Sequence, residues 1–201
     1  GTLNDKSMLD LGCSTGIMTN YYSKYFKETT GIDIDKEAIV YAEKNNGENA
    51  KYVLQNGDET NFPADTFDVI TCTQIYEHVP DSKKLLDEIY RLLKPGGVCY
   101  FSAGNRINIM EPHHKLPFLS ILPKSLANYY LYLFRGKRYY YENHLTYFGL
   151  KKLVKKFHII DYTSKIVQNP LKYEADDMIK PNSITFFVSN LIAKNLYFLF
   201  P

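Results

Sequence analysis

The first hundred residues alternate short apolar runs with segments whose apolar residues recur at helical spacing. The runs predicted as strands are Ser7–Leu11, Thr29–Ile34, Lys51–Leu54, Phe67–Thr73 and Val98–Ser102. The predicted helices are Ser14–Phe26, a segment that begins after Asp35 as its N-cap and ends near Lys44, and Ser82–Leu93. Such alternation predicts parallel strands joined by right-handed crossovers, hence a doubly wound, mostly parallel α/β sheet. In these sheets, ligands bind outside the carboxyl ends of the strands.

The alternation stops after Gly104. Residues 104–144 are rich in aromatic residues and interrupted by proline, and long structureless loops are uncommon in compact domains. We therefore predict a helical lid over residues 104–144, inserted into a single domain that spans residues 1–201. The predictions for the remaining chain are a helix over Leu145–Phe157, a sixth strand over His158–Thr163 and a helix over Ile184–Leu199.

Composition excludes several classes of protein. Hydrophobic residues make up 45% and charged residues 23% of the 201 residues, which excludes collagen-like, disordered and disulfide-scaffold chains. The three cysteines lie in apolar segments, and Gly1–Lys6 has no signal-peptide features, so we expect reduced thiols and a cytoplasmic protein. Leu116–Phe134 and Ile184–Phe200 are interrupted by charged or polar residues. They fit amphipathic or core helices better than membrane spans, and peripheral contact with a membrane and the oligomeric state stay open.

The net charge of +2 is divided unevenly along the chain. Residues 1–100 carry 10 basic and 16 acidic residues, whereas residues 101–201 carry 14 and 6. The basic stretch includes Tyr139–Tyr141, and mixtures of basic and aromatic residues can bind nucleic acid by stacking and phosphate contact. The small overall charge favours a solvated cationic face instead. We therefore expect no nucleic-acid partner, and an anionic small molecule or an acceptor at an anionic membrane fits equally well.

The segment from Leu9 to Gly16 joins a strand, a glycine-bearing turn and the start of a helix. Gly12 and Gly16 would let the backbone approach a ligand closely. Their G-x-x-x-G spacing differs from the G-x-G-x-x-G of dinucleotide sites, which disfavours a nicotinamide-dependent oxidoreductase. Asp10, two residues before the first glycine, suits a cationic ligand group better than a phosphate.

Two further acids follow strands at the same edge of the predicted sheet. Asp33 ends the second strand, where a carboxylate can accept hydrogen bonds from the two hydroxyls of a ribose. Its neighbour Asp35 is better explained as a helix N-cap. Asp58 follows the third strand, where it could hold an adenine amino group, although an Asx turn around Gly57 explains it as well.

Five blocks in the expected order resemble the class I S-adenosylmethionine-dependent methyltransferases. The blocks are LDLGCSTG, GIDID, NGDETNFPADTFDVITC, EHVPD and LLDEIYRLLKPGGVCYFS, within residues 8–103. They are most similar to the broad family of ubiquinone/menaquinone-biosynthesis-type small-molecule methyltransferases. The resemblance implies a Rossmann-like, seven-stranded-type sheet and S-adenosylmethionine as methyl donor. The usual last strand is not evident; it would lie beyond Pro201 or over Ile184–Val188.

The resemblance also implies a cofactor site. Asp10, Gly12 and Gly16 would hold the methionine end of S-adenosylmethionine. Asp33 would hold its ribose and Asp58 its adenine. Ser14 stands where many members of the family have a third glycine. The full set of expected cofactor-binding residues is Asp10, Gly12, Cys13, Ser14, Gly16, Asp33, Ile34, Asp58 and Thr73.

Methyl transfer is an in-line displacement that depends mainly on positioning and on exclusion of water. A general base is needed only for an acceptor such as a hydroxyl. His78 follows the fourth strand on the ligand side and is the candidate catalytic residue, with loop packing as its alternative. The candidate substrate residues, all in the second half, are Asn105, Arg106, His113, His114 and Tyr141.

The stretch Glu111–His114 also suggests a metal pair completed by Glu142 or His144. Adjacent histidines cannot easily face one ion, so we expect no metal there. The sequence therefore predicts methyl transfer from S-adenosylmethionine to a small-molecule or lipid-linked acceptor, such as a sugar or a quinone-like ring. The alternative is a non-catalytic protein of the same fold that binds the cofactor or a partner.

Overall fold

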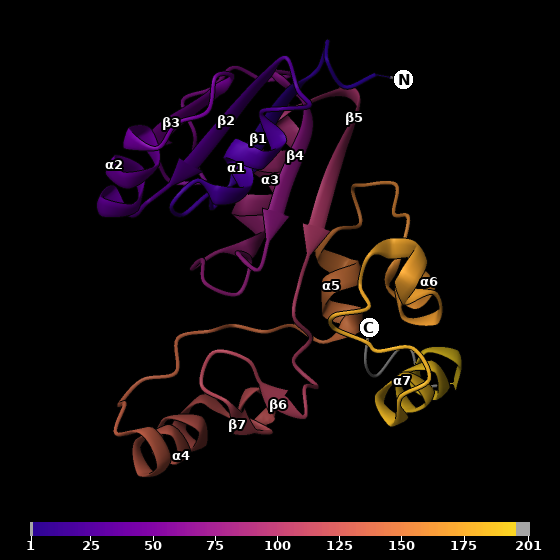
Figure 1. Ribbon diagram of the computed structural model, residues 1–201. Coiled ribbons are helices and arrows are strands. Elements are labelled where there is room, and N and C mark those ends of the chain that lie inside the picture. The colour runs from indigo at the N-terminus through magenta and orange to yellow at the C-terminus, as the bar shows by residue number, and fades with distance from the viewer. Residues whose placement is uncertain (1, 196–201) are drawn as a thin grey trace. The chain divides into compact units, whose positions relative to one another are not determined.

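A computed structural model describes residues 2–195 (Figure 1). The chain divides into two compact units, Gly1–Ala103 and Gly104–Pro201. The boundary coincides with the point after Gly104 at which the strand–helix alternation of the sequence stops. That the whole chain forms one domain with a lid over residues 104–144 stays a prediction.

The first unit contains a five-stranded sheet in the order β3-β2-β1-β4-β5. All neighbouring strands are parallel, so the predicted α/β fold class is confirmed. β1 lies between β2 and β4, where the strand order reverses, and such a switch point is where doubly wound sheets bind ligands. The strands are β1 (Ser7–Leu11), β2 (Glu28–Asp33), β3 (Ala50–Leu54), β4 (Phe67–Thr73) and β5 (Leu93–Ser102).

Three helices accompany this sheet: α1 (Ile17–Tyr22), α2 (Lys36–Lys44) and α3 (Ser82–Leu92). The predicted N-cap Asp35 accepts hydrogen bonds from the Glu37 and Ala38 amides at the start of α2. α1 is shorter than predicted because Gly16 has a left-handed backbone (φ 77°), which prevents a helix from beginning before Ile17.

The core of the first unit lies between the sheet and the helices. Leu9 in β1 and Ile70 in β4 are fully buried. The predicted stripe of α3 is buried as well, with Leu85, Ile89 and Leu92 inaccessible to solvent. Burial of such a side chain stabilises a fold by about 1.5–3 kcal/mol, so these residues hold the strand ends in place.

The second unit is built from short elements. They are β6 (Met110–Glu111), β7 (Leu116–Pro117), the 3₁₀ helix η1 (Leu119–Ile121), α4 (Lys124–Arg135), α5 (Tyr147–Leu153), α6 (Thr163–Gln168), the 3₁₀ helix η2 (Pro170–Tyr173) and α7 (Ile184–Asn195). Leu119 and Leu131 centre a small apolar cluster that joins η1 to α4. The Arg106 amide donates to the Leu145 carbonyl at 2.8 Å, so the two ends of the predicted lid lie side by side.

Several expectations for the second half are corrected. The predicted strand over His158–Thr163 is wrong: these residues are irregular until α6 begins at Thr163. Ile159 and Ile160 are 47% and 61% exposed, so this apolar run is not a buried strand. The helix expected over Leu145–Phe157 is shortened to α5.

The expected C-terminal helix is confirmed as α7, which excludes a last strand over Ile184–Val188. Its predicted end, beyond residue 195, lies outside the described residues. Within residues 2–195 the main sheet has five strands rather than seven. None of the helices described there is both long enough and apolar enough to span a membrane.

A charged network joins α3 to the loop before β4. The Glu88 carboxylate accepts two hydrogen bonds from the Arg91 guanidinium, each at 2.7 Å. It also accepts from the Thr60 amide at 2.8 Å and the Thr60 hydroxyl at 2.6 Å. These donors, Arg91 above all, lower the pKa of Glu88 from 4.5 to about 2. The ionised carboxylate therefore stabilises the folded state.

We predict that Glu88→Gln lowers the free energy of unfolding at pH 7 by about 2 kcal/mol, because it removes charge-assisted hydrogen bonds. The contribution of Glu88 is fully present above its unfolded pKa near 4.5 and is lost as pH falls through about 2. Urea unfolding at a series of pH values should therefore show a shallower loss of stability between these limits in the variant. Equal behaviour of Glu88→Gln and the exposed control Glu43→Gln would contradict this assignment.

Candidate cofactor site

The loop between β1 and α1 depends on three left-handed residues. Gly12, Ser14 and Gly16 have φ values of 79°, 47° and 77°. A Cβ atom on Gly12 would lie 2.2 Å from Ile75 Cδ1, and one on Gly16 would lie 2.5 Å from the Tyr52 hydroxyl oxygen. Neither glycine can therefore carry a side chain without displacing a neighbour. Ser14 adopts a conformation that glycine would adopt more readily.

Asp33 joins this loop to the turn after β2. Its Oδ2 accepts a hydrogen bond from the Ser14 amide at 2.8 Å, and its Oδ1 accepts one from the Asp35 amide at 2.9 Å. A carboxylate has about four lone-pair positions, so each oxygen can still accept a hydroxyl. The carboxylate is thus fixed in orientation, and its predicted role toward the hydroxyls of a ribose stays a prediction.

Asp10 lies beneath the loop. It is 8% exposed, and its two oxygens accept hydrogen bonds from the Thr19 and Thr71 hydroxyls, both at 2.7 Å. Burial raises the pKa of Asp10, while the two threonines oppose that shift. Sequence reasoning missed both threonines, because the pairing of Asp10 with Thr71 follows from the register of β1 and β4. Asp10 therefore ties the end of β1 to α1 and β4.

Cys13 and Ile34 differ in what their side chains can contribute. The Cys13 thiol belongs to an apolar cluster with Ile39 and Tyr52, and burial raises its pKa to about 12. Cys13 can therefore offer a ligand only its backbone. Ile34 directly follows Asp33 and is 75% exposed, so it presents an apolar surface beside the carboxylate.

Asp58 and Thr73 complete the predicted set at the carboxyl ends of the strands. The Asp58 amide donates to Asn56 Oδ1 at 3.3 Å, so the predicted Asx turn is present. The Asp58 carboxylate is buried, and Lys84 Nζ lies 3.8 Å from its Oδ1. Thr73 is the exposed last residue of β4.

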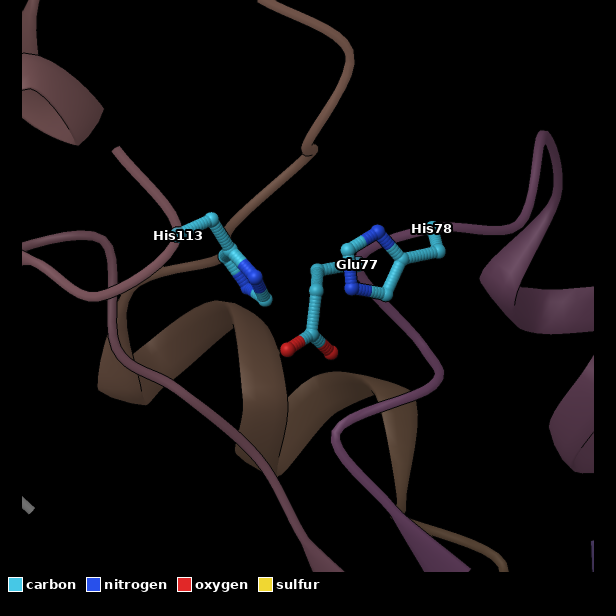
Figure 2. Close-up of side chains that lie close together, drawn as sticks. All are labelled: Glu77, His78 and His113. Atoms are coloured by element: carbon cyan, nitrogen blue, oxygen red, sulfur yellow. The ribbon is translucent and has the colours of Figure 1, made fainter. Parts of the chain in front are cut away.

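The loop after β4 carries His78. Figure 2 shows its side chain with that of Glu77, the residue before it in the loop. His78 is exposed, and its amide donates to the Ile75 carbonyl at 3.0 Å, whereas Glu77 is fully buried. Ile75 also covers Gly12, so this loop borders the glycine loop. Sequence reasoning singled out His78 but not Glu77, because burial of a carboxylate in a loop leaves no sequence signal.

The predicted substrate residues all lie in the second unit. Arg106 lines a cavity of about 240 Å³ with Lys124 and His144. Asn105 is buried and accepts a hydrogen bond from the Ile107 amide, whereas Tyr141 is 73% exposed. The predicted residues His113 and His114 belong to a group of titratable side chains between β6 and residue 144. The structure therefore does not gather the five predicted residues around this one cavity.

A separate cavity of about 290 Å³ lies at the other end of the sheet. Ser7, Glu28 and Phe67, which begin β1, β2 and β4, contribute to its lining. The residues predicted to bind the cofactor follow the carboxyl ends of these strands. This cavity is therefore not the site described above.

Comparison with known proteins identifies the family. Residues 9–101 match the family model described as a methyltransferase domain. A ubiquinone biosynthesis O-methyltransferase of Coxiella burnetii is 36% identical over 109 residues, which cover 52% of this chain and 46% of the relative. That of Actinobacillus pleuropneumoniae serotype 5b is 37% identical over 111 residues, covering 50% and 47%. The chain thus spans about half the length of the curated relatives it matches.

Solved structures agree on the fold. An S-adenosylmethionine-dependent methyltransferase from Mesorhizobium loti superposes with a TM-score of 0.63 at 16% identity, over 90% of this chain and 88% of that one. The match to a methyltransferase domain also accounts for three features of the first unit. These are the glycine loop, the acid at the end of β2 and the strand order 3-2-1-4-5. Residues 9–101 therefore belong to the class I S-adenosylmethionine-dependent methyltransferases, a family whose methyl donor is S-adenosylmethionine.

Proposed function

We propose that this protein transfers the methyl group of S-adenosylmethionine to a hydroxyl group of a small-molecule or lipid-linked acceptor. The observation that carries the proposal is the Asp33 carboxylate, held by the Ser14 and Asp35 amides at the carboxyl end of β2. It offers a preorganised acceptor for ribose hydroxyls beside a loop whose glycines cannot carry side chains.

The cofactor would extend across the carboxyl ends of three strands. Its ribose binds Asp33, and its adenine packs on exposed Ile34 and extends toward Asp58. Its methionine end lies along the Gly12–Gly16 loop, which Asp10 supports from below, with the backbone of Cys13 and Ser14 as donors. Thr73 borders the same end of the sheet. The loop after β4, which touches Gly12 through Ile75, would lie beside the methionine end of the cofactor.

The reaction itself needs little covalent help. The acceptor oxygen attacks the methyl carbon, the sulfur–methyl bond breaks, and S-adenosylhomocysteine leaves as a neutral thioether. The acceptor's proton must pass to a base during the attack, because the product is a neutral ether. We assign this role to His78, since its exposed imidazole is on a loop that borders the glycine loop.

The acceptor class rests on two observations. The curated relatives carry names that refer to O-methylation in ubiquinone biosynthesis, which favours a hydroxyl on a quinone-like ring over one on a sugar. The cavity of the second unit is lined by Arg106 and Lys124 and by one acid, Glu142, so its basic side chains outnumber the acid and suit an acceptor with an anionic group. Burial lowers the pKa of Lys124. We therefore propose that the second unit provides the acceptor site.

We predict that Asp33→Asn weakens binding of S-adenosylhomocysteine by about 10- to 100-fold, because an amide accepts at only one of its two ends. The matched control is Asp35→Asn, which changes the next acid and keeps a good N-cap for α2. Isothermal titration should show near-wild-type affinity for the control. Equal affinities of the two variants would remove Asp33 from the ribose site.

The role of His78 can be tested by chemical rescue. His78→Gly should lower the turnover of a catechol acceptor by about 10²- to 10⁴-fold, the usual contribution of a general base. Imidazole added to the buffer should restore part of the rate, because the site is exposed, and affinity for S-adenosylhomocysteine should not change. His158→Gly, at another exposed histidine, should keep full activity. A rate loss that imidazole does not rescue would indicate that His78 only shapes the loop.

Deletion of residues 108–140 should separate cofactor binding from methyl transfer. The remaining ends can be joined by a short linker, because Asn105 pairs with Leu145. We expect the shortened protein to bind S-adenosylhomocysteine within about threefold of wild type, since that site uses the first unit alone, yet to methylate no acceptor. Loss of cofactor binding as well would show that the segment is needed for the fold rather than for the acceptor.

A further inference from the structure

A group of potential metal ligands lies within the second unit, apart from the residues assigned to the cofactor. Glu111 ends β6, His113 follows in the next turn, and His144 precedes α5. One ligand atom from each lies within 4.8 Å of the other two. The His144 Nε2 and Glu111 Oε1 atoms are 3.8 Å apart, and the rings of His113 and His144 are stacked at 6.3 Å.

Glu111 indicates that a cation belongs there. Its side chain is fully buried, and its Oε2 accepts a hydrogen bond from the His114 amide at 2.6 Å. Its Oε1, which faces His144, accepts no hydrogen bond from any residue between 2 and 195. A buried carboxylate oxygen without a donor is costly, and a metal ion is one of the partners that offset this cost. The orphaned oxygen is the Glu111 atom that lies 3.8 Å from His144 Nε2.

The adjacent histidines do not compete for one ion. His114 Nε2 lies 3.5 Å from Glu142 Oε1, and the His114 ring packs edge-on against Tyr140. His113 instead belongs to the group with Glu111 and His144. The objection that neighbouring histidines cannot face the same ion therefore does not apply, because only one of them is needed.

We propose that Glu111, His113 and His144 bind a divalent transition-metal ion through one carboxylate oxygen and two imidazole nitrogens. Imidazole and carboxylate together suit Zn²⁺, for which bonds are about 2.0–2.2 Å and donor atoms about 3.4 Å apart in a tetrahedral site. The 3.8 Å between Glu111 and His144 is near this value. His113 is exposed and can rotate to close the remaining distance.

Three protein ligands leave a fourth position on the ion, as in zinc sites that bind water or substrate. His144 also lines the cavity of about 240 Å³ that contains Arg106 and Lys124. The metal thus neighbours a cavity lined by two basic side chains and the Glu142 carboxylate, and an anionic ligand in that cavity could complete its coordination. This proposal is independent of the proposed methyl transfer, because it concerns binding of the ion by the second unit.

The test uses the tag-free full-length chain, freed of metal with a chelator and titrated with Zn²⁺ by calorimetry. We expect one equivalent to bind. His113→Asn should weaken binding at least about 100-fold, since loss of even an outer-shell partner costs 10- to 100-fold. This variant changes an exposed residue, so its fold should persist. The matched control His158→Asn replaces an exposed histidine elsewhere and should bind as wild type does.

Glu111→Gln provides a second variant, because its amide oxygen can still accept from the His114 amide. Far-UV circular dichroism checks its fold, and it should also lose Zn²⁺ binding. Co²⁺ in place of Zn²⁺ should give visible absorption bands in the wild type that both ligand variants lack. Failure of the wild type to bind Zn²⁺, or wild-type affinity in either His113→Asn or folded Glu111→Gln, would overturn the proposal.

Discussion

The pair of hydrogen bonds that the Asp33 carboxylate accepts is the interaction on which the proposed cofactor site depends. The carboxylate accepts the Ser14 amide from the glycine loop and the Asp35 amide from the start of α2, and so fixes two turns that leave different strands. Asp10 joins the end of β1 to α1 and β4 through Thr19 and Thr71. The two acids differ in role, because both oxygens of Asp10 already accept hydrogen bonds from hydroxyls, while those of Asp33 can each accept a further hydrogen bond from a ligand. The site is therefore preorganised by side chains before any ligand arrives.

Sequence patterns predicted the first unit well because its strands are short buried runs between helical stripes. β4 matches the predicted Phe67–Thr73, and Asp35 caps α2 as expected. The pattern could not reveal the left-handed Gly16 that shortens α1, nor the contact of Asp10 with Thr71, which depends on strand register. Nor could it distinguish the apolar run at Ile159 from a strand, because such a run pairs only where a sheet edge is available.

The second unit shows where sequence reasoning reaches its limit. Glu111 and His113 are near neighbours in the chain, but His144 joins them only through the fold. The same fold turns His114 toward Glu142. The sequence argument against a metal site assumed that the adjacent residues His113 and His114 would both have to face one ion, and this arrangement removes that assumption. Of the proposed metal ligands, His144 also lines the cavity that contains Arg106 and Lys124, which is the proposed methyl acceptor site.

Hydrogen exchange with and without S-adenosylhomocysteine tests the central claim most directly, since it locates the bound cofactor in the wild-type chain. The account predicts slower exchange at the amides of residues 12–16 and 33–35 and in the loop around Asp58. These amides lie at the carboxyl ends of β1, β2 and β3. Protection confined to the opposite end of the sheet, around Ser7, Thr66 and Lys94 in the cavity of about 290 Å³, would contradict it.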